Sequence, residues 1–504
     1  MGDTLSLLAN GFAVALQPGN LMLCLVGAAV GTLVGVLPGL GPVATMALLL
    51  PLTYSLGPTG ALIMFAGIYY GAMYGGSTTS ILLNIPGEAA SVITCLDGHE
   101  MARQGRAGPA LGIAAFGSFI AGTASVIALT LIAAPLAQFA LRFSYPEYVA
   151  LMLLGLLLVV FLASGSLLKA FVMVGLGLLL STVGQDVVSG AFRFTFGVPT
   201  LMDGLDIGPM IMGLFGVSEV LSNIASPKER VLVQTRVRDL LPSREDWRRS
   251  RAPIGRGTVI GFLLGALPGG GAIVSSFASY AIEKRLSRTP EIFGKGAIEG
   301  VAGPESANNA ASVGSFVPLL TFGIPSNIVM AIVMGALMVH GVTPGPLLIK
   351  ERPDLFWGVI ASMYLGNIAL LVLNLPMIAL WVQVLRIPYR VLFPVILIFC
   401  AVGSYSMNNS LFDVYMMTVF GVIGFLMKRH GYEPAVLVLA FVIGPIMEQS
   451  LRQSLLLGDG SFKIFVTRPI PLVLLAAGAA LILSAAIPAI GRRRRAMVAA
   501  ADAD

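Results

Sequence analysis

The chain has 504 residues, of which 56% are hydrophobic and only 11% are charged. Soluble domains contain about 25% charged residues, so this composition excludes an ordinary soluble protein. Apolar runs long enough to cross a bilayer recur as continuous stretches, which predicts transmembrane helices and excludes a β-barrel. The formal net charge of +6 comes from basic residues in short loops and the tail. This distribution favours orientation in the membrane over binding to nucleic acid.

Residues 1–225 are predicted to form a first transmembrane repeat. Its first full span, 21–37, ends in the sequence GTLVGVLPGLG (31–41). Proline removes a backbone donor and glycine tolerates strained dihedral angles, so a helix cannot continue normally through Leu-Pro-Gly. A stretch rich in hydroxyl groups follows at 70–88. Further spans are predicted near residues 109–134, 148–162, 167–183 and 209–224.

Residues 226–256 are the only long hydrophilic segment, with nine basic and four acidic side chains. Such a segment predicts a basic cytoplasmic linker. Residues 257–446 are predicted to form a second repeat, because the break returns at 261–271 as GFLLGALPGGG. Residues 447–504 are expected to hold a loop, a last transmembrane helix and a basic cytoplasmic tail with four consecutive arginines at 492–495.

The two repeats share further landmarks in the same order. Both breaks read G-x-x-x-G-x-L-P-G-x-G, and Ile85-Pro86 recurs as Ile324-Pro325. The charges of equivalent loops differ, since 53–58 has none and its counterpart holds three basic residues at 284–288. This alternation predicts that the second half is inverted in the membrane. We therefore expect an all-α polytopic membrane protein with about 10–12 transmembrane helices, re-entrant or broken helices, and two inverted structural repeats.

The sequence contains no motif for a familiar enzyme. There is no G-x-S-x-G elbow, no H-E-x-x-H pair and no Walker A loop. The three histidines have no partner at ligand or triad spacing, and the three cysteines lie far apart without a C-x-x-C pair. We expect a protein that is not an enzyme and has no cofactor. Without a nucleotide site, its energy must come from an ion gradient or from another subunit.

The two breaks together can form an anion site. Broken helices expose backbone N–H groups and the positive end of the helix dipole, and glycines let a carboxylate approach them. Matched interruptions in two halves of a transporter also indicate its binding site. The predicted substrate-binding residues are Pro38, Gly39, Gly41, Ser77, Thr78, Thr79, Asn84, Pro268, Gly269, Gly270, Gly271, Asn308, Asn309, Ser326 and Asn327.

Four further residues are candidates for ion coupling: Glu88, Glu305, Ser80 and Thr321. The coupling ion is left open between Na⁺, which prefers hard oxygen ligands, and H⁺. Each kind of feature also has a structural explanation. G-x-x-x-G is a helix-packing pattern, and hydroxyl groups in a span often satisfy backbone carbonyls. Either glutamate could instead lie at the membrane interface and cap a helix.

Three segments together resemble one known family. They are GTLVGVLPGLGPVATMALLLPLTY (31–54), YYGAMYGGSTTSILLNIPGEAASVITCLDG (69–98) and GPESANNAASVGSFVPLLTFGIPSN (303–327). The resemblance is to the large membrane subunit of the tripartite tricarboxylate transporters, and it covers essentially the whole chain.

This resemblance implies uptake of di- and tricarboxylates such as citrate across the bacterial inner membrane, driven by a Na⁺ or proton gradient. It also implies two partners, a small membrane subunit of about four spans and a periplasmic solute-binding protein. The main alternative is a self-sufficient ion-coupled anion carrier or channel that needs no binding protein. The missing catalytic dyads argue against an intramembrane protease, and the matched breaks argue against a passive scaffold.

Overall fold

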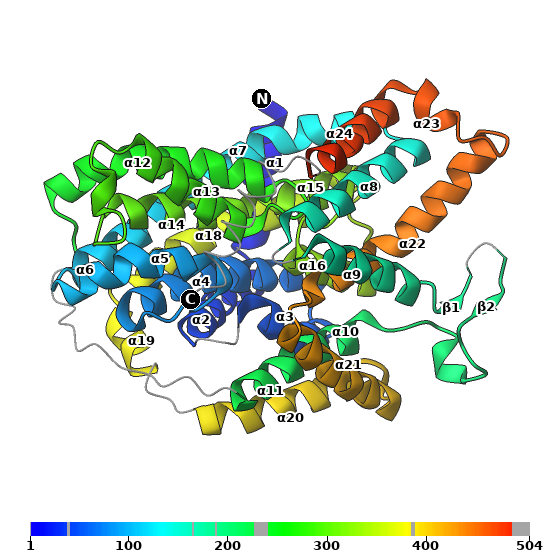
Figure 1. Ribbon diagram of the computed structural model, residues 1–504, viewed down its shortest axis with the longest axis horizontal. Coiled ribbons are helices and arrows are strands. Elements are labelled where there is room, and N and C mark those ends of the chain that lie inside the picture. The colour runs from blue at the N-terminus through cyan, green and yellow to red at the C-terminus, as the bar shows by residue number, and fades with distance from the viewer. Residues whose placement is uncertain are drawn as a thin grey trace.

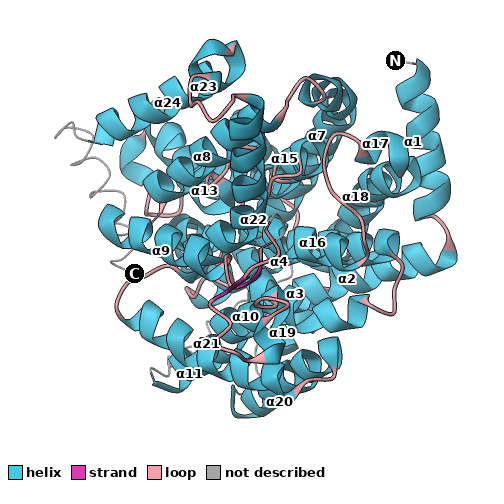
Figure 2. Ribbon diagram, turned by 90° about the vertical axis from the view of Figure 1, so that its right-hand side faces the viewer, coloured by secondary structure: helices cyan, strands magenta, loops and turns pink. Residues whose placement is uncertain are grey.

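The computed structural model describes residues 2–37, 41–163, 166–186, 189–225, 240–384 and 389–485. Within these ranges the chain is helical except for loops and one antiparallel pair of short strands, β1 (Gly184–Gln185) and β2 (Phe192–Arg193) (Figures 1 and 2). The predicted site residues Pro38 and Gly39 lie outside the described residues. So do 226–239 of the predicted linker and the arginine run at 492–495.

Seven helices among the described residues are long and apolar enough to cross a membrane. They are Pro18–Val36, Ala107–Ala140, Tyr145–Leu162, Ile207–Ala225, Pro353–Asn374, Leu411–Arg429 and Pro434–Leu457. Shorter apolar helices accompany them at Thr4–Ala15, Gly41–Thr53, Leu167–Leu180, Ile328–Val339, Phe393–Asn408 and Pro469–Leu483. The protein is therefore an all-α, multi-pass membrane protein, while the count of 10–12 transmembrane helices stays a prediction.

The first half begins with the long helices that surround the first break. These are α1 (Gly2–Ala15), α2 (Pro18–Val36), α3 (Gly41–Thr53) and α4 (Pro58–Leu83). Short helical turns follow: η1 (Ala89–Ser91), α5 (Val92–Thr94), η2 (Cys95–His99) and α6 (Glu100–Arg103). The half closes with α7 (Ala107–Ala140), α8 (Tyr145–Leu162), α9 (Leu167–Leu180), the β1–β2 pair, η3 (Pro199–Leu201), α10 (Ile207–Ile211), η4 (Met212–Val217) and α11 (Ser218–Ala225).

The second half begins with α12, which runs across the predicted boundary at residue 256. Its elements around the second break are α12 (Arg244–Gly265), α13 (Gly271–Leu286), η5 (Pro290–Ile292), α14 (Glu299–Gly314), α15 (Phe316–Phe322) and α16 (Ile328–Val339). The remaining helices are α17 (Leu348–Glu351), α18 (Pro353–Asn374), α19 (Ile378–Val384), α20 (Tyr389–Asn408), α21 (Leu411–Arg429), α22 (Pro434–Leu457), α23 (Ile464–Thr467) and α24 (Pro469–Ala485).

The centre of the molecule is formed by the helices with the most small and polar residues. Every residue from Gly60 to Leu83 in α4 is buried, and so is every residue from Gly300 to Gly314 in α14. Large apolar side chains are instead exposed on outer helices, for example Leu168 on α9 and Tyr415 on α21. This arrangement suits a lipid environment, where apolar surface has no reason to be hidden and polar groups need partners inside the protein.

Close packing of small residues holds one tight helix pair in each half. A Cβ atom at Gly31 on α2 would lie 2.4 Å from the carbonyl oxygen of Ile68 on α4. In the second half, a Cβ atom at Gly261 on α12 would lie 2.2 Å from the carbonyl oxygen of Ala307 on α14. The G-x-x-x-G part of both breaks therefore packs helices together, as its structural explanation proposed. In Figure 1 the green helices α12, α13 and α14 lie above the blue helices α2 and α4.

The two central helices end in the same way. Asn84 closes α4 with φ 56°, and Gly323 closes α15 with φ 70°, both in the left-handed region. Each is followed by Ile-Pro, which cannot continue a helix, and then by a capping side chain. Glu88 accepts a hydrogen bond from the N–H of Ala90, and Asn327 accepts one from the N–H of Met330. The repeated local sequence thus produces a repeated local structure.

Three basic loops lie together at one end of the bundle. Arg106, at the start of α7, forms an ion pair with Asp246 near the start of α12. The amide of Gln104 donates to the carbonyl oxygen of Lys295, in the loop before α14, at 2.9 Å. The α6–α7 loop, the linker and the α13–α14 loop therefore share one side of the molecule, called the linker side below.

Candidate functional site

A single cavity of about 580 Å³ lies where the two breaks meet. Gly41 comes from the first break, and Gly269, Gly270 and Gly271 come from the second, 230 residues later. The segment 86–89 and the residues 327–329, which follow the two Ile-Pro turns, complete the inner wall. Tertiary packing therefore brings four separate segments of the two halves to one space. Pockets of this volume suit small organic ligands.

Four helices begin at the wall of this cavity. They are α3 at Gly41, α13 at Gly271, α16 after Asn327 and α22 after Glu433. The first turn of a helix has N–H groups without intrahelical partners and the positive end of the helix dipole. Such helix starts attract anions, so a cavity surrounded by four of them favours a negatively charged ligand.

The glycines that begin α3 and α13 have the same unusual conformation. Gly41 has φ +51° and Gly271 has φ +49°, a left-handed conformation that most side chains adopt at a cost. No atom lies within 4 Å of a Cβ placed on either residue. At these two positions the glycine is therefore required by the backbone and leaves the helix start open to a ligand. Gly269 differs, because its Cβ would lie 2.7 Å from Val159 Cα.

The cavity also contains charges that the motifs did not predict. Lys428 near the end of α21 lies 2.6 Å from the carboxylate of Glu219 on α11, and both line the cavity with Glu433. Lys428 lies outside both breaks and both Ile-Pro motifs, so no sequence motif marked it. Glu219 interrupts an apolar span, which was the available signal, because ionisable residues inside spans are functional candidates by default. Tyr69 and Met73 of α4 complete the same wall.

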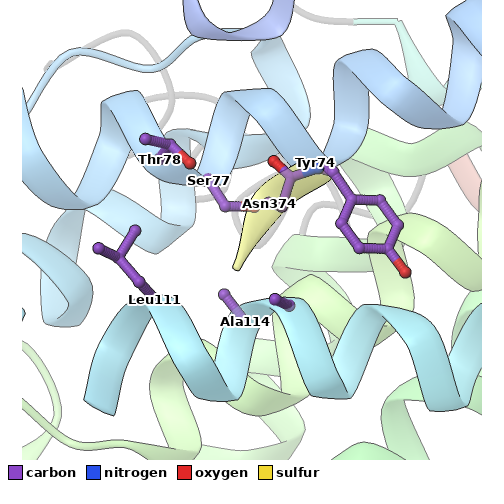
Figure 3. Close-up of a pocket in the computed structure, with 7 residues that line it drawn as sticks. Tyr74, Ser77, Thr78, Leu111, Ala114 and Asn374 are labelled. Carbon is purple, nitrogen blue, oxygen red and sulfur yellow. The ribbon is translucent and has the colours of Figure 1, made fainter. Parts of the chain in front are cut away.

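Several predicted binding residues lie elsewhere. Asn84 is an exposed helix cap, and Pro268 packs near Gly155 of α8. Ser77 and Thr78 line a separate pocket of about 10 Å³. Figure 3 shows this pocket between α4 and the side chains of Leu111 and Ala114 on α7. Its volume is that of one water molecule and is too small for a carboxylate substrate.

Other predicted hydroxyl groups bond to the protein itself. Thr79 donates at 2.8 Å to the carbonyl oxygen of Val36, which is the last residue of α2 before the break. Ser80 donates to the hydroxyl of Ser91 at 2.9 Å, and Thr321 donates to the carbonyl oxygen of Val317 at 2.7 Å. Ser326 donates to the carbonyl oxygen of Ser315 at 3.1 Å. These contacts satisfy backbone and side-chain groups within broken helices.

The asparagine pair of α14 lies behind the cavity wall. Asn308 donates to the Glu88 carboxylate at 3.2 Å, and Asn309 donates to the hydroxyl of Ser118 at 2.7 Å. Asn308 thus supports a residue that lines the cavity, while Asn309 ties α14 to α7. Both asparagines retain a buried carbonyl oxygen without a partner among the described residues.

The two glutamates have different environments. Glu88 lines the cavity and caps η1 through the N–H of Ala90 at 2.7 Å. Glu305 is fully buried in α14, away from the cavity, and accepts hydrogen bonds from the hydroxyls of Ser77 and Thr94. Among the described residues, no group of three or more His, Cys, Asp or Glu side chains could hold a metal ion.

The chain is similar in sequence to known proteins. The model of the tripartite tricarboxylate transporter TctA family matches residues 21–439. An Agrobacterium vitis protein named "Uncharacterized 52.8 kDa protein in TAR-I ttuC' 3'region" is 53% identical over 494 residues, covering 98% of both chains. A second A. vitis protein, named for the TAR-II ttuC' 3'region, is 54% identical over 234 residues, covering 46% of this chain and 97% of that protein. No solved structure matches the chain significantly.

Proposed function

Since this chain belongs to the tripartite tricarboxylate transporter TctA family, we propose that it takes up small di- and tricarboxylates such as citrate across the bacterial inner membrane. It acts as the large subunit beside a small membrane subunit of about four spans. A periplasmic solute-binding protein delivers the substrate, and a Na⁺ or proton gradient drives uptake. The observation that supports this best is the one cavity that both breaks and four helix starts surround.

The substrate carboxylates bind at the starts of α3 and α13. Each helix dipole contributes about 0.3–1 kcal/mol to the binding of an anion, so the affinity is modest and release stays fast. Lys428 supplies the cation on the cavity wall, and it is paired with Glu219 when no substrate is bound. A substrate carboxylate therefore competes with Glu219 for Lys428.

The two halves form inverted repeats. In each half a helix ends at Leu-Pro-Gly and a second helix returns, giving the pairs α2–α3 and α12–α13. The α13–α14 loop lies on the linker side, whereas the uncharged α3–α4 turn contains no basic residue to hold it there. Two re-entrant hairpins that enter from opposite sides and meet at mid-membrane would create the observed cavity.

The cavity faces the cytoplasm in this conformation. Ala163 at the end of α8, Glu219 on α11 and Lys428 on α21 are among the residues that line it. Helix α11 leads directly into the basic segment 226–256, which the positive-inside rule places in the cytoplasm. This conformation would therefore follow substrate binding from the periplasmic side, and from it the substrate would be released into the cell.

Uptake of labelled carboxylates into membrane vesicles tests the function. Vesicles would contain this chain with its small membrane subunit, and the binding protein would be present or absent. Uptake that needs all three proteins supports the proposal. Uptake that is equal without the binding protein supports the self-sufficient carrier instead. If a panel of di- and tricarboxylates gives no uptake above vesicles that lack the chain, the proposal is wrong.

A pair of variants tests the site separately. Lys428→Met removes the cavity cation and should raise the substrate KM about 10- to 150-fold, since a charged hydrogen bond contributes about 1.5–3 kcal/mol. Glu219→Gln removes the competing carboxylate and should lower KM. The exposed Lys463, between α22 and α23, provides the matched control as Lys463→Met. A KM that moves in the same direction for both cavity variants would contradict competition for Lys428.

A further inference from the structure

Glu305 is a buried carboxyl group that the cavity does not use. It lies in the middle of α14 and is 0% exposed. The hydroxyl of Ser77 on α4 and the hydroxyl of Thr94 on α5 each contact one of its two oxygens. The group therefore joins α14 of the second half to α4 and α5 of the first half, at a position where transport must change the packing between the halves.

No positive charge balances Glu305 in the part of the chain that the structure describes. Its helix neighbours α4, α5 and α7 present no Lys, Arg or His. On α12, Arg249 pairs with Glu299 and Arg256 pairs with Glu283, and among the described residues no ion pair reaches Glu305. The titratable and charged groups on the elements packed around α14, from α4, the η1 cap, η2, α12 and α13 in turn, are Tyr69, Tyr70, Tyr74, Glu88, Cys95, Asp97, His99, Arg244, Glu245, Asp246, Arg248, Arg249, Arg251, Arg256, Tyr280, Glu283, Lys284 and Arg285.

Asp97, another buried acid packed beside α14, has hydrogen-bond partners for both of its carboxylate oxygens. It accepts hydrogen bonds from the N–H groups of Gly294, Gly296 and Ala297 and from the hydroxyl of Tyr280. Four donors stabilise an ionised carboxylate without a cation. Glu305 has only two neutral hydroxyls, so an ionised Glu305 would be a poorly compensated buried charge.

The hydrogen bonds around Glu305 fit the neutral acid, because every hydroxyl and acid proton then has an acceptor. Ser77 Oγ lies 3.3 Å from the carbonyl oxygen of Met73, which can only accept. When Ser77 donates to Met73, its own oxygen is free to accept the acid proton of Glu305 Oε2. Thr94 then donates to Oε1. Protonated Glu305 thus bonds at both oxygens.

A small pocket lies beside the same serine. Ser77 lines the pocket of about 10 Å³ shown in Figure 3, whose volume matches one water molecule. Asn374, which lies beside Ser77 in Figure 3, is 4% exposed, and its side-chain carbonyl oxygen has no partner among the described residues. A water in this pocket would donate to Asn374 and lie beside the Ser77 hydroxyl. One hydroxyl group would then separate it from Glu305.

We propose that Glu305 is the coupling site and binds the proton that is co-transported with the carboxylate substrate. The proton arrives through the pocket water, Ser77 passes one proton to Glu305 Oε2 while accepting another from the water, and an O–H bond forms on the acid. When α4 and α14 separate and water from the cytoplasmic side reaches Glu305, the acid O–H bond breaks, the proton passes to that water and the carboxylate remains. Glu88 differs from Glu305 in its place, because it lines the substrate cavity and accepts there from Ala90 and Asn308. This inference rests on the proposed carboxylate uptake.

Transport assays in proteoliposomes can distinguish proton coupling from substrate binding. The proteoliposomes would contain both membrane subunits, and the binding protein would be added. With the membrane potential held at zero, a pH gradient of about one unit can drive about tenfold accumulation per proton. Glu305→Gln copies the neutral acid, because its amide can donate to Ser77 and accept from Thr94. We expect this variant to lose accumulation driven by the pH gradient and to keep exchange of labelled for unlabelled carboxylate. The exposed Glu351 gives the matched control, Glu351→Gln, which should keep both.

Two further variants test the role of Glu305 independently of the Glu305→Gln variant. Glu88→Gln should change substrate affinity and keep accumulation driven by the pH gradient. Ser77→Ala should slow the internal acidification that accompanies carboxylate uptake, measured with a pH-sensitive dye, even if Glu305→Gln fails to fold.

Several results would overturn the assignment. These are accumulation by Glu305→Gln, loss of coupling only in Glu88→Gln, wild-type acidification in Ser77→Ala, or wild-type accumulation driven by a Na⁺ gradient alone. A wild-type protein that neither accumulates nor exchanges any carboxylate would instead refute the proposed function.

Discussion

Replacing Gly261 with alanine should destabilise the protein, although alanine normally favours a helix. Gly261 lies within α12, where Gly→Ala gains about 0.5–1 kcal/mol in a helix interior with free space. Here the new Cβ would lie 2.2 Å from the carbonyl oxygen of Ala307 and 2.7 Å from its Cα. Ordinary contacts begin near 3.4 Å, so α12 and α14 must move apart by roughly 1.2 Å. Such overpacking costs about 1–3 kcal/mol.

The matched control lies on the same helix. Gly255 is exposed, and no atom lies within 4 Å of a Cβ placed there. Gly255→Ala should therefore raise the free energy of unfolding by about 0.5–1 kcal/mol, while Gly261→Ala lowers it. Thermal unfolding of the purified protein in detergent, with a parallel denaturant titration, measures both signs. Stabilisation by Gly261→Ala equal to that by Gly255→Ala would refute the close packing of α12 on α14.

Three further predictions follow from the helix starts, the linker side and the orientation. Gly271→Asn fits the left-handed backbone at φ +49° but places a side chain in the cavity. It should therefore weaken uptake without lowering the melting temperature. The control Gly341→Asn, at φ +68° in open space, should leave uptake intact. Burial acts to raise the pKa of Asp246, but hydrogen bonds from Ser243 and the guanidinium of Arg106 outweigh it and hold the pKa below its ordinary value. A lowered folded-state pKa stabilises the protein above the ordinary pKa of about 4, and this stability is lost as the pH falls through the lowered value. Asp246→Asn should therefore lower the free energy of unfolding at neutral pH by about 1 kcal/mol, and this difference from the wild type should shrink below pH about 4. A difference that stays constant with pH would contradict the ion pair. Finally, a cysteine at Arg251 should resist impermeant reagents added from the periplasm, and rapid labelling would contradict the cytoplasmic linker.

The sequence predicted the features that depend on neighbouring residues. Proline and glycine limit the backbone where they stand, so the ends of α2 and α12 at Leu-Pro-Gly and the ends of α4 and α15 before Ile-Pro were visible without a structure. The apolar spans and the duplicated motifs likewise indicated a multi-pass membrane protein, and the quoted segments identified its family.

The sequence did not show which glycines of one motif pack helices together and which line the cavity. Gly31 and Gly41 belong to the same eleven residues, yet Gly31 packs against α4 and Gly41 opens into the cavity. The same holds for the hydroxyl-rich stretch, where Ser77 contacts Glu305 and Thr79 contacts the end of α2. Which face of a helix meets a neighbour depends on the crossing of whole helices, and short patterns do not contain that information.

The sequence by itself determined the local structure of this protein: helices that span a membrane, where they break, and the fact that the breaks come in pairs. Only the tertiary structure decided that the two breaks share one cavity with Lys428 and Glu219, and that Glu305 lies behind it beside Ser77. The physical reason is distance along the chain. Residues more than 200 positions apart are brought together by side-chain packing over the whole bundle, whereas a helix break depends on a few adjacent residues.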